Sequence, residues 1–191
     1  MTLISVFGPD GVGKSTFCRR FDGAEVISGT NINTWGDTTW AQEFDEKGID
    51  ESRVNSSEHF IEKIKRLRTM LGSYPVEKLV VIDSDPFHKT LIHRLMRRGH
   101  RDPEQVFDVL LDDTGVVLSD TRHLLIQVSS KLSDLEQAEI LQERINIRAA
   151  DCVFDPRTTE ESRMMVLAAD EAARLIESRN VAVERLYTNE Q

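Results

Sequence analysis

Short apolar runs recur along the chain, and stretches with helical spacing separate most of them. Five of these runs are predicted strands: Leu3–Phe7, Ala24–Ser28, Lys78–Asp83, His123–Ser129 and Asp151–Asp155. Because the runs are continuous rather than alternating, the strands should be buried on both faces, as in a parallel sheet with helical crossovers. A last run, Val181–Thr188, is interpreted as either a short strand or a tail. The pattern predicts an α/β fold of three layers, in which helices flank a five-stranded parallel sheet, in one domain over residues 1–191.

The predicted helices carry recognisable start signals. Ser133 with Glu136, and Thr158 with Glu161, have the spacing of capping boxes. The second pair should open a final helix over Thr159–Ser178, whose apolar stripe we interpret as core packing.

Composition excludes several classes of protein. The 191 residues carry a formal net charge of −9, which argues against broad nucleic-acid binding, since that needs a positive surface. No apolar run is long enough to span a membrane, and Leu3–Phe7 lacks the features of a secretion signal. The two cysteines, Cys18 and Cys152, do not form a disulfide framework, so we expect a reducing, cytoplasmic setting.

The segment after the first predicted strand matches a phosphate-binding loop of the P-loop (Walker A) type, Gly8-x-x-x-x-Gly13-Lys14-Ser15. Glycines let successive amides point at phosphate oxygens, and the helix that follows adds its positive end. Lys14 should reach the β- and γ-phosphates of ATP, and Ser15 should ligate Mg²⁺. The expected nucleotide contacts are Gly8, Pro9, Gly11, Val12, Gly13, Lys14, Ser15 and Thr16.

Acidic residues end the strand over Lys78–Asp83. Ligands gather at the carboxyl ends of parallel strands, so Asp83 is the candidate acid on the Mg²⁺ side, acting through a water. Asp85 could share this catalytic task. Alternatively it caps the next helix, which Pro86 can open.

The loop sequence "GPDGVGKST" resembles the start of thymidylate kinases, within the nucleoside-monophosphate-kinase group of P-loop proteins. The resemblance implies that Asp10 faces the sugar of the phosphate acceptor. A carboxylate directed at the donor phosphates would oppose its own ligand, which agrees with that placement. The alternative is that Asp10 only makes hydrogen bonds within its turn.

The resemblance extends weakly to the C-terminal part, "CVFDPRTTEESRMM", and implies that Asp155 lies near the donor adenine. Two features depart from the family. Ser84 stands where the family has an arginine for the acceptor phosphate, and residues 130–150 read as a helix rather than an arginine-bearing lid. Arg144 and Arg148 are the candidates for a reduced lid.

A basic segment over residues 86–101 stands out in this acidic protein. Its functional interpretation is that His88 and Lys89 hold the acceptor phosphate in place of the missing arginine. A solvated amphipathic helix, with His88 packed inside, is the alternative. Trp35 could stack on a substrate base.

These observations predict an ATP- and Mg²⁺-dependent phosphotransferase with a small-molecule acceptor, and a nucleoside monophosphate is the first candidate. In this scheme Lys14, Asp83, Asp10 and Asp85 are the catalytic candidates. The alternatives are a nucleotide-dependent switch or slow NTPase with a protein partner, and a kinase for a non-nucleotide metabolite. The sequence leaves a homodimer open.

Overall fold

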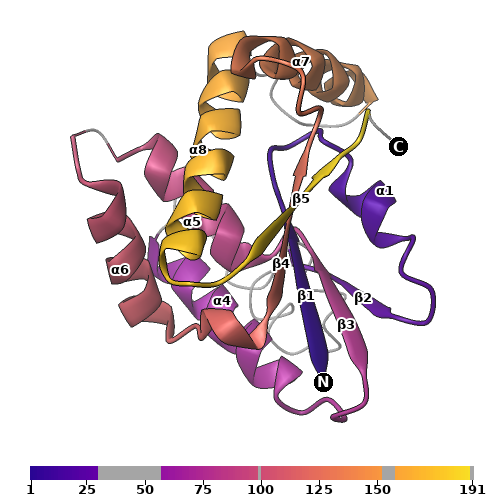
Figure 1. Ribbon diagram of the computed structural model, residues 1–191, viewed down its shortest axis with the longest axis vertical. Helices are drawn as coiled ribbons and strands as arrows, with labels where there is room; N and C mark the ends of the chain where they lie inside the picture. The colour runs from indigo at the N-terminus through magenta and orange to yellow at the C-terminus, as the bar shows by residue number, and fades with distance from the viewer. Residues whose placement is uncertain (30–56, 99, 152–157, 190–191) are drawn as a thin grey trace.

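A single parallel sheet organises the protein (Figure 1). The structure is a computed structural model that describes residues 1–29, 57–98, 100–151 and 158–189. The strands are β1 (Thr2–Phe7), β2 (Glu25–Ser28), β3 (Leu79–Asp83), β4 (Arg122–Gln127) and β5 (Val183–Tyr187), in the order β2-β3-β1-β4-β5. All pairings are parallel. The predicted α/β class and five-stranded parallel sheet flanked by helices are confirmed.

The fifth strand is not the one predicted. Asp151 is the last residue of helix α7 (Asp134–Asp151), so a strand beginning there is wrong, and residues 152–155 lie outside the described part. The edge position belongs to β5, which pairs with β4 from Val183 to Tyr187. An edge strand pairs with a neighbour on one side only, so the mixed sequence Val-Glu-Arg-Leu-Tyr, which is partly exposed, is suited to this position. A search for continuous apolar runs favours strands that are buried on both faces, and therefore does not identify β5.

Helices pack on both faces of the sheet (Figure 1). They are α1 (Lys14–Cys18), α4 (Ser57–Leu71), α5 (Pro86–Met96), α6 (Pro103–Thr114), α7 and α8 (Thr159–Ser178), with a 3-10 turn η2 (Leu118–Asp120) before β4. Successive strand residues point to opposite faces. Phe7 and Leu125 therefore meet α5 and α8, while Ile4 and Leu124 meet the side of α1 and α7.

Both predicted capping boxes form. Thr158 and Glu161 exchange side-chain and backbone hydrogen bonds, as do Ser133 and Glu136. The last helix has the predicted bounds, Thr159–Ser178. The basic helix is shorter than expected: it ends at Met96, and Asp102 caps a new helix that starts at Pro103.

Gly8 is the first residue after β1 and lies directly against the backbone of β4. A Cβ on this residue would lie 2.3 Å from the carbonyl oxygen of Ile126, and its φ is 142°. Both facts exclude a side chain, because the oxygen belongs to the sheet backbone and cannot move aside. The close approach fixes where the loop begins relative to the sheet.

We predict that Gly8→Ala lowers the free energy of unfolding by about 3 kcal/mol, because it combines a backbone clash with a strained φ. Gly115→Ala is the matched control, since Gly115 also has a positive φ of 66° but has no atom within 4 Å of its Cβ position. That variant should lose about 1 kcal/mol. Urea unfolding measures both, and equal losses would contradict the role given to the close approach.

Candidate functional site

The loop between β1 and α1 is curled by its glycines and closed by its lysine. Gly8, Gly11 and Gly13 have φ values of 142°, 81° and 96°. The Lys14 ammonium donates hydrogen bonds to the carbonyl oxygens of Gly8, at 3.0 Å, and Pro9, at 2.7 Å. Lys14 is buried, and in this ligand-free structure its ammonium group is bound by the loop's own carbonyl oxygens.

Asp10 lies beside that lysine. Its Oδ1 is 3.8 Å from the Lys14 Nζ, and its side chain is 36% exposed. Its backbone N–H donates to the sulfur of Met165 in α8, at 3.0 Å, which holds the tip of the loop against that helix. The carboxylate therefore lies near the Lys14 ammonium while remaining open to solvent.

A pocket lies at the carboxyl edge of β1 and β3. Its lining includes Gly8, Asp10, Lys14, Ser84, Asp85 and Lys89. The structure thus brings the loop residues together with Lys89 of α5, as the sequence suggested. This is the place where ligands bind in open parallel sheets, because the strand order reverses around β1.

A second lysine accompanies Lys89. Lys63 of α4 is buried, and its pKa is lowered to about 8, first by burial and then by the positive charge of Lys89. The two lysines come from neighbouring helices and are near enough for their charges to repel each other. Lys63 has no place in the sequence prediction.

The proposed metal ligands supply oxygen donors. Asp83 ends β3 opposite Val6 of β1, is partly exposed, and accepts a hydrogen bond from the Ser84 hydroxyl at 3.2 Å. Ser15 is exposed at the start of α1. A carboxylate and a hydroxyl oxygen fit Mg²⁺, which takes few protein ligands besides phosphate oxygens and water. Within the described residues there is no cluster of three or more His, Cys, Asp or Glu that could hold a metal alone.

Cys18 is a packing residue rather than a nucleophile. It is fully buried, and its pKa is raised to about 12, first by burial and then by the charge of Asp83. A thiol with so high a pKa is not ionised at neutral pH.

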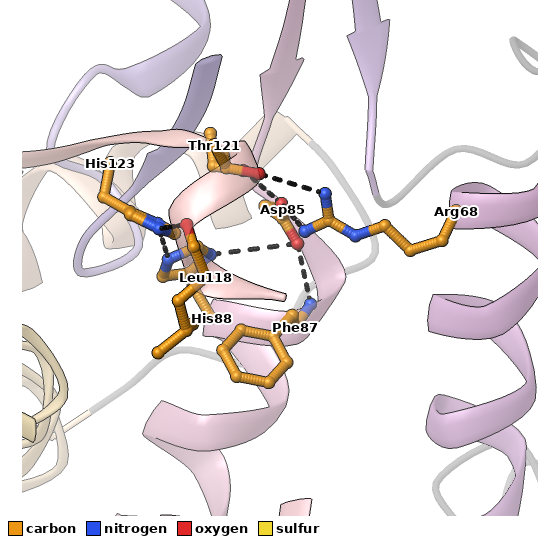
Figure 2. A network of polar contacts seen from close by, with 8 residues as sticks. Arg68, Asp85, Phe87, His88, Leu118, Thr121 and His123 are labelled. Carbon is orange, nitrogen blue, oxygen red and sulfur yellow. Dashed lines mark hydrogen bonds and ion pairs between the residues drawn. The ribbon is translucent and has the colours of Figure 1, made fainter. Parts of the chain in front are cut away.

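Asp85 is the centre of a buried polar network (Figure 2). Its carboxylate accepts hydrogen bonds from the backbone N–H of Phe87, at 2.9 Å, and from the Ser5 hydroxyl, and it pairs with Arg68 at 3.1 Å. Burial alone would raise the pKa of Asp85, but the Arg68 guanidinium, the His88 ring and the Ser5 hydroxyl hold it well below its usual range. The capping role that the sequence left open is therefore present.

His88 is packed inside rather than in the pocket. It is fully buried, its ring stacks on Phe7 at 4.2 Å between centroids, and its Nε2 lies 2.9 Å from Nδ1 of His123. The His123 Nε2 is 2.9 Å from the Leu118 carbonyl, which can only accept, so this nitrogen carries the proton and Nδ1 accepts from His88. The pKa of His123 is lowered to about 4, first by burial and then by His88, which keeps it neutral at pH 7.

The proposed lid arginines are not brought into the pocket by the described contacts. Arg144 donates to the side chain of Asn189 at 3.1 Å. Its helix α7 presses on the loop: a Cβ on Gly11 would lie 3.0 Å from the Ile145 side chain. The side chain of Arg148, and all of Trp35 and Asp155, lie outside the described residues.

Three members of the buried network were missed in the sequence. Ser5 and His123 are polar positions inside apolar strand runs, and Arg68 follows the buried Leu67 on α4. A polar residue within an otherwise buried run requires a partner, which is the signal that could have identified them.

The chain matches no protein-family model and no curated protein. The likeness to thymidylate kinases therefore rests on the motif residues themselves. Among the helices that the structure describes, none has the length and apolar character needed to cross a membrane.

We predict that Asp85→Asn lowers the free energy of unfolding at pH 7 by about 3 kcal/mol, because the side chain keeps its shape but leaves Arg68 without its counter-charge. The folded-state pKa of Asp85 lies below its unfolded value of about 3.9. Its contribution is therefore fully present above that value and is lost as the pH falls below it. The difference in free energy of unfolding between wild type and Asp85→Asn should therefore become smaller as the pH falls below about 4.

The control is Asp120→Asn, an exposed residue in η2, which should change stability by less than about 0.5 kcal/mol. Denaturant unfolding at pH 7 and at acidic pH compares the three proteins. A gap for Asp85→Asn that stays constant with pH would contradict the charged role of this carboxylate.

Proposed function

We propose that the protein is a small-molecule kinase that uses ATP and Mg²⁺, with a nucleoside monophosphate as the first candidate acceptor. One observation carries this proposal: Lys14 and Asp10 of the glycine loop line the same pocket as Lys89 of α5. Groups suited to two substrates thus converge at one edge of the sheet.

The donor side is formed by the loop. On binding, Lys14 would exchange the carbonyls of Gly8 and Pro9 for phosphate oxygens, which carry full charge and accept stronger hydrogen bonds. Ser15 and Asp83 would hold Mg²⁺, which neutralises phosphate charge when bound. The backbone N–H groups of residues 11–15 would complete the cradle.

The acceptor side is formed by Lys89, which lines the pocket together with Ser84. Ser84 stands where an arginine is expected for the acceptor phosphate, and Lys89 would supply positive charge there instead. Asp10, half-exposed between the two sides, can accept a hydrogen bond from an acceptor hydroxyl.

The reaction needs no covalent group on the protein. An anionic oxygen of the acceptor phosphate forms a bond to the γ-phosphorus, the bond from that phosphorus to its bridging oxygen breaks, and ADP leaves. A phosphate oxygen has no proton to lose, so neither Asp10 nor Asp85 is required as a base. Catalysis would come from positioning and from the charges of Lys14 and Lys89.

A switch or slow NTPase is the second candidate, and one observation favours it. Helix α7 is continuous from Asp134 to Asp151, and Arg144 is engaged by Asn189 rather than directed into the pocket. Such a protein would hydrolyse ATP slowly without an acceptor and present one nucleotide state to a partner. In either case we propose a reducing, cytoplasmic setting, in keeping with the buried thiol of Cys18.

We predict that ADP release, followed in a coupled assay, is stimulated by a member of a panel of nucleoside monophosphates, nucleosides and phosphorylated metabolites. Lys89→Met should raise the KM for that acceptor by about tenfold or more, the value of a lost charge-assisted hydrogen bond, without changing the KM for ATP. Lys14→Met should abolish turnover with every acceptor.

Lys65→Met is the control, because Lys65 is an exposed lysine on α4, two positions from Lys63. It should leave both KM values unchanged. ATP binding with no stimulation by any acceptor would overturn the kinase proposal. Slow hydrolysis under those conditions would favour the switch.

A further inference from the structure

A second, larger pocket lies between α4, α5 and α6, and the proposed phosphotransfer does not use it. Arginines from the end of α5 and the turn that follows line one side of it: Arg94, Arg97, Arg98 and Arg101. This turn joins α5 to α6 at the left of Figure 1. Phe60, Val106 and Val109 provide apolar walls.

Three of the four arginines have little to neutralise them: Arg97, Arg98 and Arg101. Arg94 pairs with Asp113 of α6 at 3.5 Å, and Asp113 is the one carboxylate within the described lining. No ion pair to Arg97, Arg98 or Arg101 is present among the described residues. Such a concentration of positive charge is unusual in a protein of net charge −9. Arg97 and Arg101 are exposed, so their attraction for an anion acts partly through solvent and should weaken as the salt concentration rises.

The backbone next to the arginines is hydrogen-bonded. The backbone N–H of Arg97 donates to the His93 carbonyl at 3.2 Å, and that of Arg101 donates to the Arg98 carbonyl at 3.2 Å. The side chains of all four arginines line this pocket. A cluster of forked donors suits several phosphate oxygens at once.

A buried hydroxyl provides a second and independent indication. Thr90 of α5 lines this pocket, is 4% exposed, and its Oγ1 has no hydrogen-bond partner. Buried hydroxyls in folded proteins are nearly always bonded, so an unpartnered one at a pocket indicates a group supplied from outside. A phosphate oxygen can accept from this hydroxyl as it does from the arginines.

We propose that this pocket binds a small polyphosphate-bearing molecule, separately from the phosphate-binding loop. The apolar walls beside the arginines suit a ligand whose charged phosphates adjoin a less polar portion. His93 lines this pocket and also the smaller one, so a ligand here would lie next to the proposed acceptor site. The inference stands on the pocket's own residues and does not require that the protein be a kinase.

Calorimetric titration of the full chain with inorganic tripolyphosphate tests this site. Wild type and Lys14→Met should both bind, because the loop lysine is not involved. Replacing Arg97, Arg98 and Arg101 together by serine in the Lys14→Met background, which removes binding at the proposed nucleotide loop, should weaken tripolyphosphate binding by about a thousandfold, at about tenfold for each lost charge-assisted hydrogen bond. The matched control replaces Arg66, Arg122 and Arg174, which pair with carboxylates elsewhere, and should retain the affinity.

Thr90→Val separates ligand binding from folding. It should weaken tripolyphosphate binding while leaving thermal stability unchanged or higher, because it removes a buried hydroxyl that has no partner in the free protein. The proposal is overturned by wild type failing to bind at low salt, by binding that Lys14→Met abolishes, or by equal affinity in the two triple variants. A single-stranded oligonucleotide that binds where tripolyphosphate does not would also overturn it, and would assign the arginines to nucleic acid.

Discussion

The buried carboxylate of Asp85 is the constraint on which the functional edge of the sheet depends. It joins the start of α5 to β1 through Ser5 and to α4 through Arg68 (Figure 2). Arg68 continues the connection to Thr121, just before β4, at 3.3 Å. An unpaired charge at this depth would be strongly destabilising, so the pair holds these elements in one arrangement. Lys89 lies one turn into α5, so the Asp85–Arg68 pair that fixes the start of this helix also positions Lys89 beside the loop.

This arrangement assigns different tasks to the two acids that follow β3. Asp85 is fully buried with its oxygens occupied, while Asp83 lies at the strand end and is partly exposed. A similar contrast separates His88, fully buried on Phe7, from Lys89, which lines the pocket. Neighbouring residues of one short segment are thus divided between buried supports, Asp85 and His88, and the residues to which we assign the proposed chemistry, Asp83 and Lys89. At this edge of the sheet the Asp85 carboxylate is buried and paired with Arg68, whereas Asp83 and Lys89 are partly exposed.

The sequence predicted the sheet well because buried parallel strands are continuous apolar runs and capped helices have short local signals. It failed where those signals do not apply. The edge strand β5 is only partly buried, so its sequence mixes polar and apolar residues and could equally be interpreted as an irregular C-terminal tail. Local spacing also identified the loop with Lys14, since curled glycines before a helix form a contiguous motif. The partners of Asp85 come from distant parts of the chain, such as Ser5 and Arg68, and only folding brings them together.

The central claim is that the glycine loop after β1 is a nucleotide site. The most direct measurement is a ¹⁵N–¹H correlation spectrum of the labelled full chain during titration with Mg·ATP. If Mg·ATP binds there, the amide signals of Gly8, Gly11 and Gly13 should shift and saturate together, since their N–H groups would contact the phosphates. Unchanged loop signals, with shifts confined to other parts of the protein, would contradict it.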